Sequence, residues 1–556
     1  MGAPPRAVTG RWRARLWLVP ATLFVAPLAA ALGWGVADGI DAGAWSRLLA
    51  DPRFRPALAL SLQVGAASTA LAAALALALA TALHGTRAWG RLVHALPALL
   101  AVPHAAFAIG LGLLVMPSGF LARLVAPVAG WSAPPDVATV HDPGGWALVA
   151  ALVLKEVPFL LWNVAAQWQR VGQAAALERQ LQTAAAMGYA RRTAWARVLW
   201  PQWLPTLAWP LLAVWAYSLA VVDMALVLGP TRPPTLAVLA WQWLLDADPA
   251  ANRQGAAAAL ALALAMAGVA AAVALAWRAS RPWRASRWTR GDRPAARDAA
   301  GRRAAGASAA ALVSVYAAVL ALLGFVSVAG VWTFPDLAPQ RWTGDAWSAV
   351  RASASTVGLT AALALASSAA GLALAVAWME TTPARWDARA APAVFATLLV
   401  PGVLLAGGLY RAALQAGVDG RFAGLWLAHT VHVAPYVLVA LAPAYRSHDP
   451  RYAQTARALG RGAAATLWRV KWPMLLAPLA AAFAVGFAVS VTQYLPTQFV
   501  GAGRHATLTT EALTRASGGQ RDVAAAFALV QALLPAAVFA AAAWIGRPGR
   551  PPGGGR

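Results

Sequence analysis

Apolar runs long enough to cross a membrane recur along the whole of this 556-residue chain. A helix needs roughly 20 consecutive apolar residues to span the hydrocarbon core of a bilayer. Hydrophobic residues make up 60% of the sequence and charged residues only 12%, about half the charged share of an ordinary soluble protein. The sequence therefore predicts an all-α, polytopic membrane protein, and it excludes a soluble enzyme with a single anchor.

The apolar runs predict about twelve transmembrane helices in two sets of six. The first set is expected at residues 16–37, 57–83, 92–115, 146–166, 203–228 and 256–277. The second set is expected at 309–332, 356–378, 393–414, 425–442, 474–500 and 523–545. We therefore expect a first domain over residues 1–277, a basic linker over 278–308 and a second domain over 309–556.

Basic residues concentrate in every second connecting segment, including the N-terminal arm, residues 170–197, residues 446–471 and the C-terminal tail. The alternate segments mix arginines with aspartates. Because loops rich in Lys and Arg stay in the cytoplasm, this pattern predicts that both termini are cytoplasmic. The same distribution explains the net charge of +25 without nucleic-acid binding. The linker carries nine arginines between Arg278 and Arg303, which is typical of a tether beside anionic lipid headgroups, a regulatory arm being the alternative.

Two predicted cytoplasmic segments match each other without gaps, 272 residues apart. They are TAAAMGYARRTAWARVLWPQWLP, which starts at Thr183, and TARALGRGAAATLWRVKWPMLLA, which starts at Thr455. Gly, Arg, Trp and Pro recur in fixed register, and the register continues into the next span, where Gly229 pairs with Gly501. Chance composition can supply alanines but not this set, so the chain contains an internal duplication.

Each copy predicts a short Ala-rich helix, a turn at a glycine, and a second basic amphipathic helix that ends at Trp-Pro. Glycine allows the chain to turn and another surface to approach closely. Proline fits the first turn of a helix, so we expect Pro201 and Pro473 to mark re-entry into the membrane. One such segment would be an ordinary connection, whereas two in register favour a docking role.

The spacing of these residues resembles the EAA loop of ABC importer permeases. In the first copy the opening triplet and the glycine are Thr183, Ala184, Ala185 and Gly188. In the second copy they are Thr455, Ala456, Arg457 and Gly460. Both copies have Thr where the family has an acidic residue, Arg457 replaces the second Ala, and Trp precedes the proline. Over essentially its whole length the chain resembles two consecutive permease domains. It is most similar to the fused double permeases of the iron(III), thiamine and polyamine importer group, with a thiamine-like branch as one option.

This resemblance implies a bacterial inner-membrane protein whose two loops are coupling helices. They would rest on two copies of an ATPase subunit at the cytoplasmic face, and a periplasmic binding protein would deliver a small solute to the other face. ATP would be bound by the partner subunits, so no cofactor is expected on this chain and no catalytic residue.

The sequence lacks a nucleotide-binding motif, which is what we expect if a partner protein supplies the energy for transport. A nucleotide-binding P-loop needs Lys after Gly and before Ser or Thr, and neither Lys155 nor Lys471 has these neighbours. The leading alternative is a twelve-helix proton- or sodium-coupled secondary transporter, which should show several buried acids and no twin docking loops. A membrane enzyme acting on lipid-linked substrates is a third option, but it would need a carboxylate or His cluster at one interface.

A few polar residues fall inside the predicted spans, where ionisable groups are costly and usually functional. Lys155 and Glu156 are adjacent, so they diverge by about 100° on a helix and must find separate partners. They either pair structurally or line the pathway. Asp223 is a pathway candidate because its repeat counterpart is apolar. His429 and His432 share one helix face without a nearby carboxylate or cysteine, so we expect structural histidines and no metal.

A second group of pathway candidates lies in the eleventh predicted span. Gln493, Tyr494 and Gln498 surround Pro496, which we expect to interrupt the helix. Broken helices with polar groups at a repeat interface are frequent solute sites in transporters. Polar groups of this kind also join helices to each other, and that alternative stays open.

Overall fold

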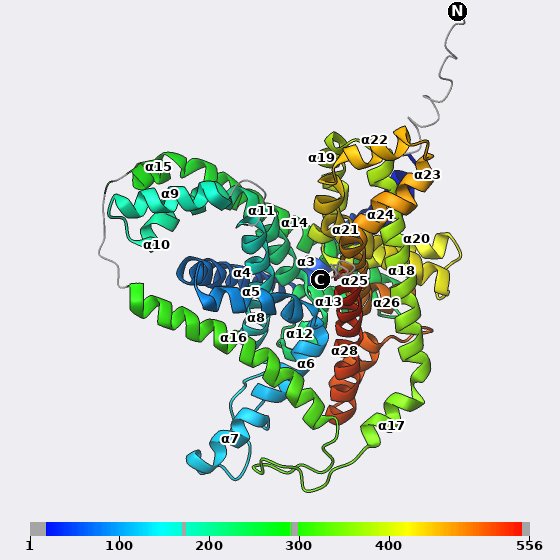
Figure 1. Cartoon of the computed structure of the whole chain (residues 1–556). Coiled ribbons are helices and arrows are strands. Elements are labelled where there is room, and N and C mark those ends of the chain that lie inside the picture. The colour runs from blue at the N-terminus through cyan, green and yellow to red at the C-terminus, as the bar shows by residue number, and fades with distance from the viewer. Residues whose placement is uncertain (1–17, 169–173, 290, 292–297, 548–556) are drawn as a thin grey trace, which may run out of the picture.

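The computed structural model describes residues 18–168, 174–289, 291 and 298–547, and helices dominate these residues (Figure 1). Ten helices in the described part are long and apolar enough to cross a membrane, and two bent helix pairs raise the number to twelve if each pair is one span. The prediction of an all-α polytopic membrane protein is therefore confirmed.

The helices of the first half run from α2 to α15. They are α2 (Leu18–Gly39), α3 (Ala42–Ala50), α4 (Phe54–Leu83), α5 (Arg87–Ala101), α6 (His104–Val115), α7 (Phe120–Ala129), α8 (Trp146–Trp168), α9 (Ala174–Ala186), α10 (Arg191–Ala194), η1 (Trp195–Leu199), α11 (Trp200–Ala220), α12 (Asp223–Leu228), α13 (Leu236–Leu244), α14 (Pro249–Ala279) and α15 (Arg281–Thr289).

The second half repeats this order closely. Its helices are α16 (Asp298–Val326), α17 (Asp345–Ala352), α18 (Ala354–Thr381), η2 (Ala384–Trp386), α19 (Asp387–Leu399), α20 (Gly402–Gln415), α21 (Phe422–Arg446), α22 (Pro450–Ala458), α23 (Ala463–Thr466), η3 (Leu467–Lys471), α24 (Trp472–Met474), α25 (Leu476–Thr492), α26 (Leu495–Val500), α27 (Leu508–Ser517) and α28 (Arg521–Ile545).

Four predicted spans are broken, and an interruption was expected from the sequence only in the eleventh. The third and ninth break before Pro103 and Pro401, because proline has no amide to continue the hydrogen-bond ladder, and α19 meets α20 at 102°. The fifth and eleventh break after Ala220 and Thr492. The second of these two breaks precedes Pro496, but the first occurs without any proline between α11 and α12, so a proline is not what the two have in common.

The expected basic linker is helical where it is described. It contains α15 and the start of α16, so residue 309 lies inside a helix and not at its beginning. The N-terminal arm, the end of the C-terminal tail, and residues 169–173, 290 and 292–297 lie outside the described residues.

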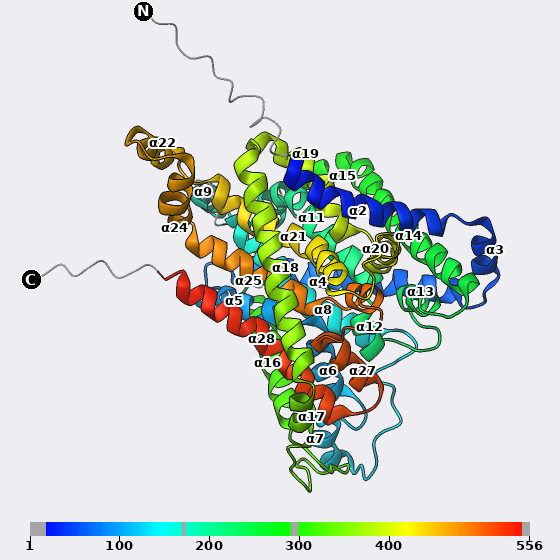
Figure 2. The same cartoon turned by 90° about the vertical axis from the view of Figure 1, so that its right-hand side faces the viewer.

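The first long helix of each half crosses to pack against the other half. Helix α2 packs along α20, and α16 packs along α6 (Figure 2). Both contacts depend on a glycine, because a Cβ added to Gly408 would lie 1.8 Å from the carbonyl oxygen of Ala31, and one added to Gly110 would lie 2.6 Å from Cγ1 of Val319. Small residues let membrane helices approach this closely, so the two halves interlock through a reciprocal pair of crossings.

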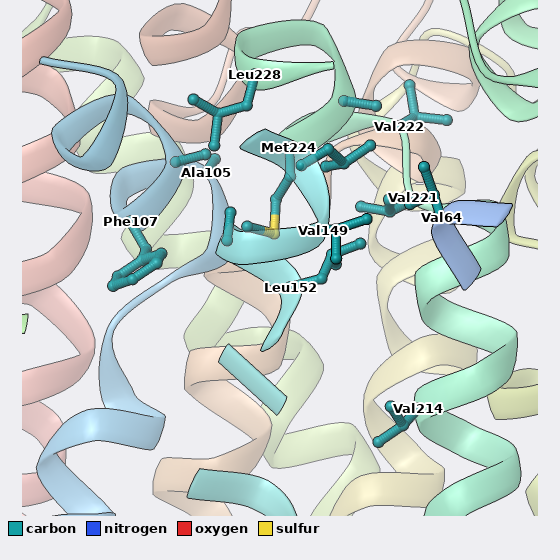
Figure 3. Close-up of a cluster of buried hydrophobic side chains, with 14 of the residues drawn as sticks. Val64, Ala105, Phe107, Val149, Leu152, Val214, Val221, Val222, Met224 and Leu228 are labelled. Carbon is teal, nitrogen blue, oxygen red and sulfur yellow. The ribbon is translucent and has the colours of Figure 1, made fainter. Parts of the chain in front are cut away.

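A buried hydrophobic core fills the space between the helices of the first half. Figure 3 shows side chains of α6, α8, α11 and α12 in this cluster, including Phe107, Leu152, Val214 and Met224. The same cluster continues into α16, α27 and α28 of the second half. The core is therefore shared between the halves, which agrees with the crossed first helices.

The glycine crossing gives a prediction with a matched control. Replacing Gly408 by Ala should lower the stability of the purified protein by about 1–3 kcal/mol, because the added methyl group forces α2 and α20 apart. Replacing Gly358 by Ala on α18, where nothing lies within 4 Å, should instead be neutral or stabilising by up to about 1 kcal/mol. Thermal unfolding in detergent measures both, and equal melting temperatures would show that the crossing is not tightly packed.

Candidate functional site

The first duplicated loop ends helix α9 in a defined glycine turn. The amide of Tyr189 donates to the carbonyl of Ala184 at 3.0 Å, and the amide of Gly188 donates to the carbonyl of Ala185 at 2.9 Å. Gly188 has a φ of +81°, which L side chains rarely adopt. This is a Schellman motif, in which two carbonyls at the helix end are satisfied by the reversing chain.

The second duplicated loop ends helix α22 in the same way. Arg461 donates to the carbonyl of Ala456 and Gly460 donates to the carbonyl of Arg457, both at 3.0 Å, and Gly460 has a φ of +77°. The two turns therefore contain equivalent hydrogen bonds. Gly188 and Gly460, which the sequence predicted at the turns, adopt the positive φ that each turn requires.

The two loop helices expose equivalent positions. Ala184 and Ala456 are 3% and 5% exposed and pack inward. The other predicted loop residues are exposed: Thr183, Ala185, Gly188, Thr455, Arg457 and Gly460. Each loop helix thus packs against the rest of the chain through one small side chain. The other predicted residues of the helix and its turn are exposed to solvent and accessible to a partner.

Sequence reasoning missed one pair of residues in these loops. Met187 is 50% exposed and Leu459 is 76% exposed, and each directly precedes the glycine of its turn. Their alignment in the repeat was a usable signal, but only the structure shows that both side chains project from the tip. Two exposed apolar side chains at equivalent tips are typical of a docking surface.

Pro201 and Pro473 do not end the helices that precede them, contrary to the sequence-based expectation. A π-helical turn, η1 or η3, comes directly before each proline, and the helix continues into α11 or α24. A proline clashes with the carbonyl four residues earlier in an α-helix, and the wider π turn accommodates it. The second copy bends only after Met474, where its two arms meet at 79°.

The first loop is held by an arginine and a group of aromatic rings. Arg191 donates to the carbonyl oxygens of Thr81 and His84 at 2.7 and 2.5 Å. The ring centroid of His84 lies 3.8 Å from that of Trp168 and 5.5 Å from that of Trp195. Burial, with a smaller contribution from the charge of Arg191, lowers the pKa of His84 to about 4, so this imidazole stays neutral at pH 7.

The second loop is held by different residues. Lys471 makes a 2.5 Å ion pair with Glu380, and the Tyr445 hydroxyl donates to the same carboxylate at 2.6 Å. Trp472 in turn donates to the Tyr445 oxygen at 3.1 Å. The duplicated loops therefore share their turn geometry but not their anchors.

Both loops lie at one end of the molecule. Figures 1 and 2 place α9 and α22 at the end opposite to α7 and α17. The paired tips are therefore on one face, where two partner subunits could reach them together.

The structure gives Lys155 and Glu156 separate partners, as expected from their spacing. The Lys155 ammonium donates to the carbonyl of Val102 at 2.7 Å, and it lies 5.4 Å from the ring centroid of Tyr316. A carboxylate oxygen of Glu156 lies 4.0 Å from Nε2 of His104. Val102 lies in the break between α5 and α6, so the Lys155 side chain contacts the backbone at this break.

Asp223 begins the short helix α12 directly after the break in the fifth span. The Tyr217 hydroxyl makes a long hydrogen bond of 3.5 Å to its carboxylate, and the ring centroid of Tyr217 lies 4.8 Å from that of His104. Glu156, His104, Tyr217 and Asp223 therefore form a polar chain, in which the link between His104 and Tyr217 is a contact between the two rings. Asp223, Tyr217 and His104 are each partly exposed, so this chain borders accessible space.

In the part of the chain that the structure describes, the pathway candidates of the second half are not joined to one another by side-chain contacts such as those that link the first-half residues. The side-chain amide of Gln493 donates to the carbonyl of Val489 at 3.2 Å, which places it at the C-terminal end of α25. The ring centroid of Tyr494 lies 6.2 Å from that of Trp241 on α13, which joins the halves. For Gln498, the backbone amide donates to the carbonyl of Tyr494 at 2.9 Å, which places this residue in the first turn of α26.

The two histidines of α21 have protein partners. Nδ1 of His429 lies 2.9 Å from Oγ of Ser490, and Nε2 lies 2.9 Å from Oγ1 of Thr497. Both ring nitrogens are thus engaged by hydroxyls. His432 contacts the carbonyl of Ala428 through Nδ1 at 2.9 Å. Within the described ranges, no group of three or more His, Cys, Asp or Glu could hold a metal ion.

The comparison with known proteins identifies the family. No family profile matches the chain. The inner membrane ABC transporter permease protein YnjC of Escherichia coli (strain K12) is 34% identical over 542 residues, which cover 96% of this chain and 96% of the relative. A match of this length spans both halves of the chain. Together with the helical fold, it shows that the chain belongs to the inner membrane ABC transporter permeases.

Proposed function

We propose that this permease forms the translocation pathway of a binding-protein-dependent importer. The observation that carries the proposal is the pair of exposed loops, which have the same Schellman turn and the same apolar tip on one face of the molecule. Two equivalent tips fit two copies of an ATPase subunit on the cytoplasmic face. A periplasmic binding protein would deliver a small solute to the opposite end, and both chain termini would lie in the cytoplasm.

The internal repeat supports a division into two permease domains, residues 1–277 and 309–556, joined by the basic segment 278–308. Two consecutive permease domains in one chain also favour the iron(III), thiamine and polyamine group of importers. In each domain the loop would act as a coupling helix that transmits closure of an ATPase subunit to the spans. ATP would be held by the partners, and this chain would bind no cofactor.

The apolar tips explain how docking could work without the acidic residue of the family pattern. Thr183 and Thr455 carry no charge, so they cannot form an ion pair with a partner. Burial of Met187 and Leu459 in grooves of the ATPase subunits would supply hydrophobic free energy instead, about 1.5–3 kcal/mol for each side chain.

For the pathway we propose the polar chain of Glu156, His104, Tyr217 and Asp223 together with Tyr494 from the second half. Asp223 and Tyr494 lie where the fifth and eleventh spans break, and broken helices at a repeat interface are typical solute sites. Lys155, Gln493 and Gln498 would support the breaks and the packing around them. An ion-coupled secondary transporter is the competing function, because Glu156 and Asp223 are carboxylates within the spans.

The docking tips can be tested by replacing Leu459 with Glu. A charge in an apolar groove would weaken association with the ATPase subunit by at least about 30-fold. The substitution removes the favourable burial of an apolar side chain, and desolvation of the new carboxylate opposes binding. Met187→Glu should have the same effect at the other tip. Co-purification of the co-expressed ATPase subunit measures both.

The matched control is Val137→Glu, which adds the same charge to a side chain that is 57% exposed in the loop between α7 and α8. It should leave association unchanged. If the tip variants retain the ATPase as well as this control does, or if wild type brings down no ATPase, the two loops are not its docking sites and the importer proposal loses the observation that carries it.

The pathway can be tested by cysteine labelling, because the chain contains no cysteine of its own. The Asp223→Cys variant should react with a membrane-impermeant thiosulfonate reagent, and the rate should change at least about threefold when the complex is trapped with ATP and vanadate, since a thiol reacts where water reaches it. Leu264→Cys on α14, where the native side chain is 58% exposed to the surrounding lipid, should stay unreactive. If the Asp223→Cys variant is unreactive in every state, Asp223 does not belong to the pathway.

A further inference from the structure

A cavity of about 230 Å³ lies between α2 of the first half and four elements of the second half, α18, η2, α19 and α21. Its lining includes Phe24 of α2, Trp378 of α18, Pro435 of α21, and Ala393 and Arg389 of α19. The walls are apolar except for Arg389, and the cavity is open on one side. It is therefore a crevice with an apolar interior and a basic residue in its lining.

The crevice lies at the loop-bearing end of the molecule. Its walls are the start of α2, the end of α18 and the start of α19, and Figure 2 shows α2 beginning beside α19. Trp378 and Trp386 are part of the lining, and tryptophan is enriched where the hydrocarbon core meets the headgroups. The crevice therefore sits at the level where an acyl chain joins its headgroup.

The carboxylates near this crevice are already neutralised. Asp387 receives two hydrogen bonds from Arg446, at 2.7 and 2.9 Å, and a third from Trp378 at 2.9 Å. Glu380 is paired with Lys471. Arg385 and Arg389 are exposed, and among the described residues neither forms an ion pair. The guanidinium of Arg389 lies 4.9 Å from the ring centroid of Trp386, which leaves its charge available at the mouth.

We propose that this crevice binds an anionic phospholipid, with one acyl chain in the apolar interior and the headgroup phosphate at Arg389 and Arg385. The charge excess selects an anionic headgroup, as basic pockets between membrane helices do. The crevice is too narrow for another helix, and a free phosphate would leave its apolar interior empty. A bound lipid would bridge α2 to α18, α19 and α21, and so would strengthen the contact between the halves. Its assignment to the cytoplasmic leaflet rests on the proposed orientation.

The test uses the purified full-length chain, delipidated and titrated with phosphatidylglycerol or phosphatidylcholine, with retained lipid counted by native mass spectrometry. Wild type should retain at least one phosphatidylglycerol more strongly than phosphatidylcholine. The double variant Arg385→Gln/Arg389→Gln should lose this preference, with an affinity for phosphatidylglycerol roughly fivefold lower per arginine. Arg351→Gln, which removes an exposed arginine of α17 at the opposite end, should behave as wild type.

A second variant separates the acyl chain from the headgroup. Ala393→Phe fills the crevice and should abolish the retained phosphatidylglycerol while leaving both arginines in place. Each variant must elute as a single folded species, and thermal stabilisation by added phosphatidylglycerol gives an independent readout. Equal retention of the two lipids by wild type, unchanged binding in the Ala393 or arginine variants, or equal stabilisation by glycerol phosphate alone would overturn the proposal. These measurements need no ATPase subunit, so they stand apart from the docking experiments.

Discussion

The arrangement of this permease depends on the cost of leaving a backbone amide unpaired inside lipid. Each half breaks a span and starts a short helix, α13 or α27, in the membrane region, and the first amide of such a helix has no partner within the helix. Leu236 donates its amide to Oγ of Ser61 at 2.8 Å, and Leu508 donates to Oγ1 of Thr360 at 2.9 Å. One buried hydroxyl on α4 or α18 therefore satisfies the first amide of each short helix.

The duplicated loops show which features two docking sites must share. The backbone turns, the π-helical turns and the exposed apolar tips are the same in both copies, whereas the anchors are an arginine with aromatic rings in one and an ion pair with a tyrosine in the other. In the proposed docking role a partner subunit would contact the outer surface of each loop, and this would constrain the geometry of that surface. The residues beneath it need only hold the loop still, and unrelated side chains can do so.

Local patterns predicted much of this molecule, and packing between distant segments decided the rest. Apolar length and the 272-residue repeat were sufficient for the helical fold and for both glycine turns. The pairing of Asp223 with Tyr217, the exposure of Met187 and Leu459, and the crossing of α2 onto α20 were not predictable. Each of these features depends on which helix faces pack against each other in the folded protein. The broken spans were partly visible, since Pro103 and Pro401 mark two breaks, but the break after Ala220 has no proline signal.

The crossing of α2 onto α20 also has a consequence for how the protein is made. Helix α2 is translated long before α20, yet the glycine surface that receives it lies on α20, far downstream in the second half. During synthesis α2 must therefore remain in the bilayer, with the face that will contact α20 exposed to lipid, until α20 has been inserted. A helix that is inserted early is thus among the last to reach its final neighbour. Truncation before α20 would leave α2 without the helix against which it packs most extensively.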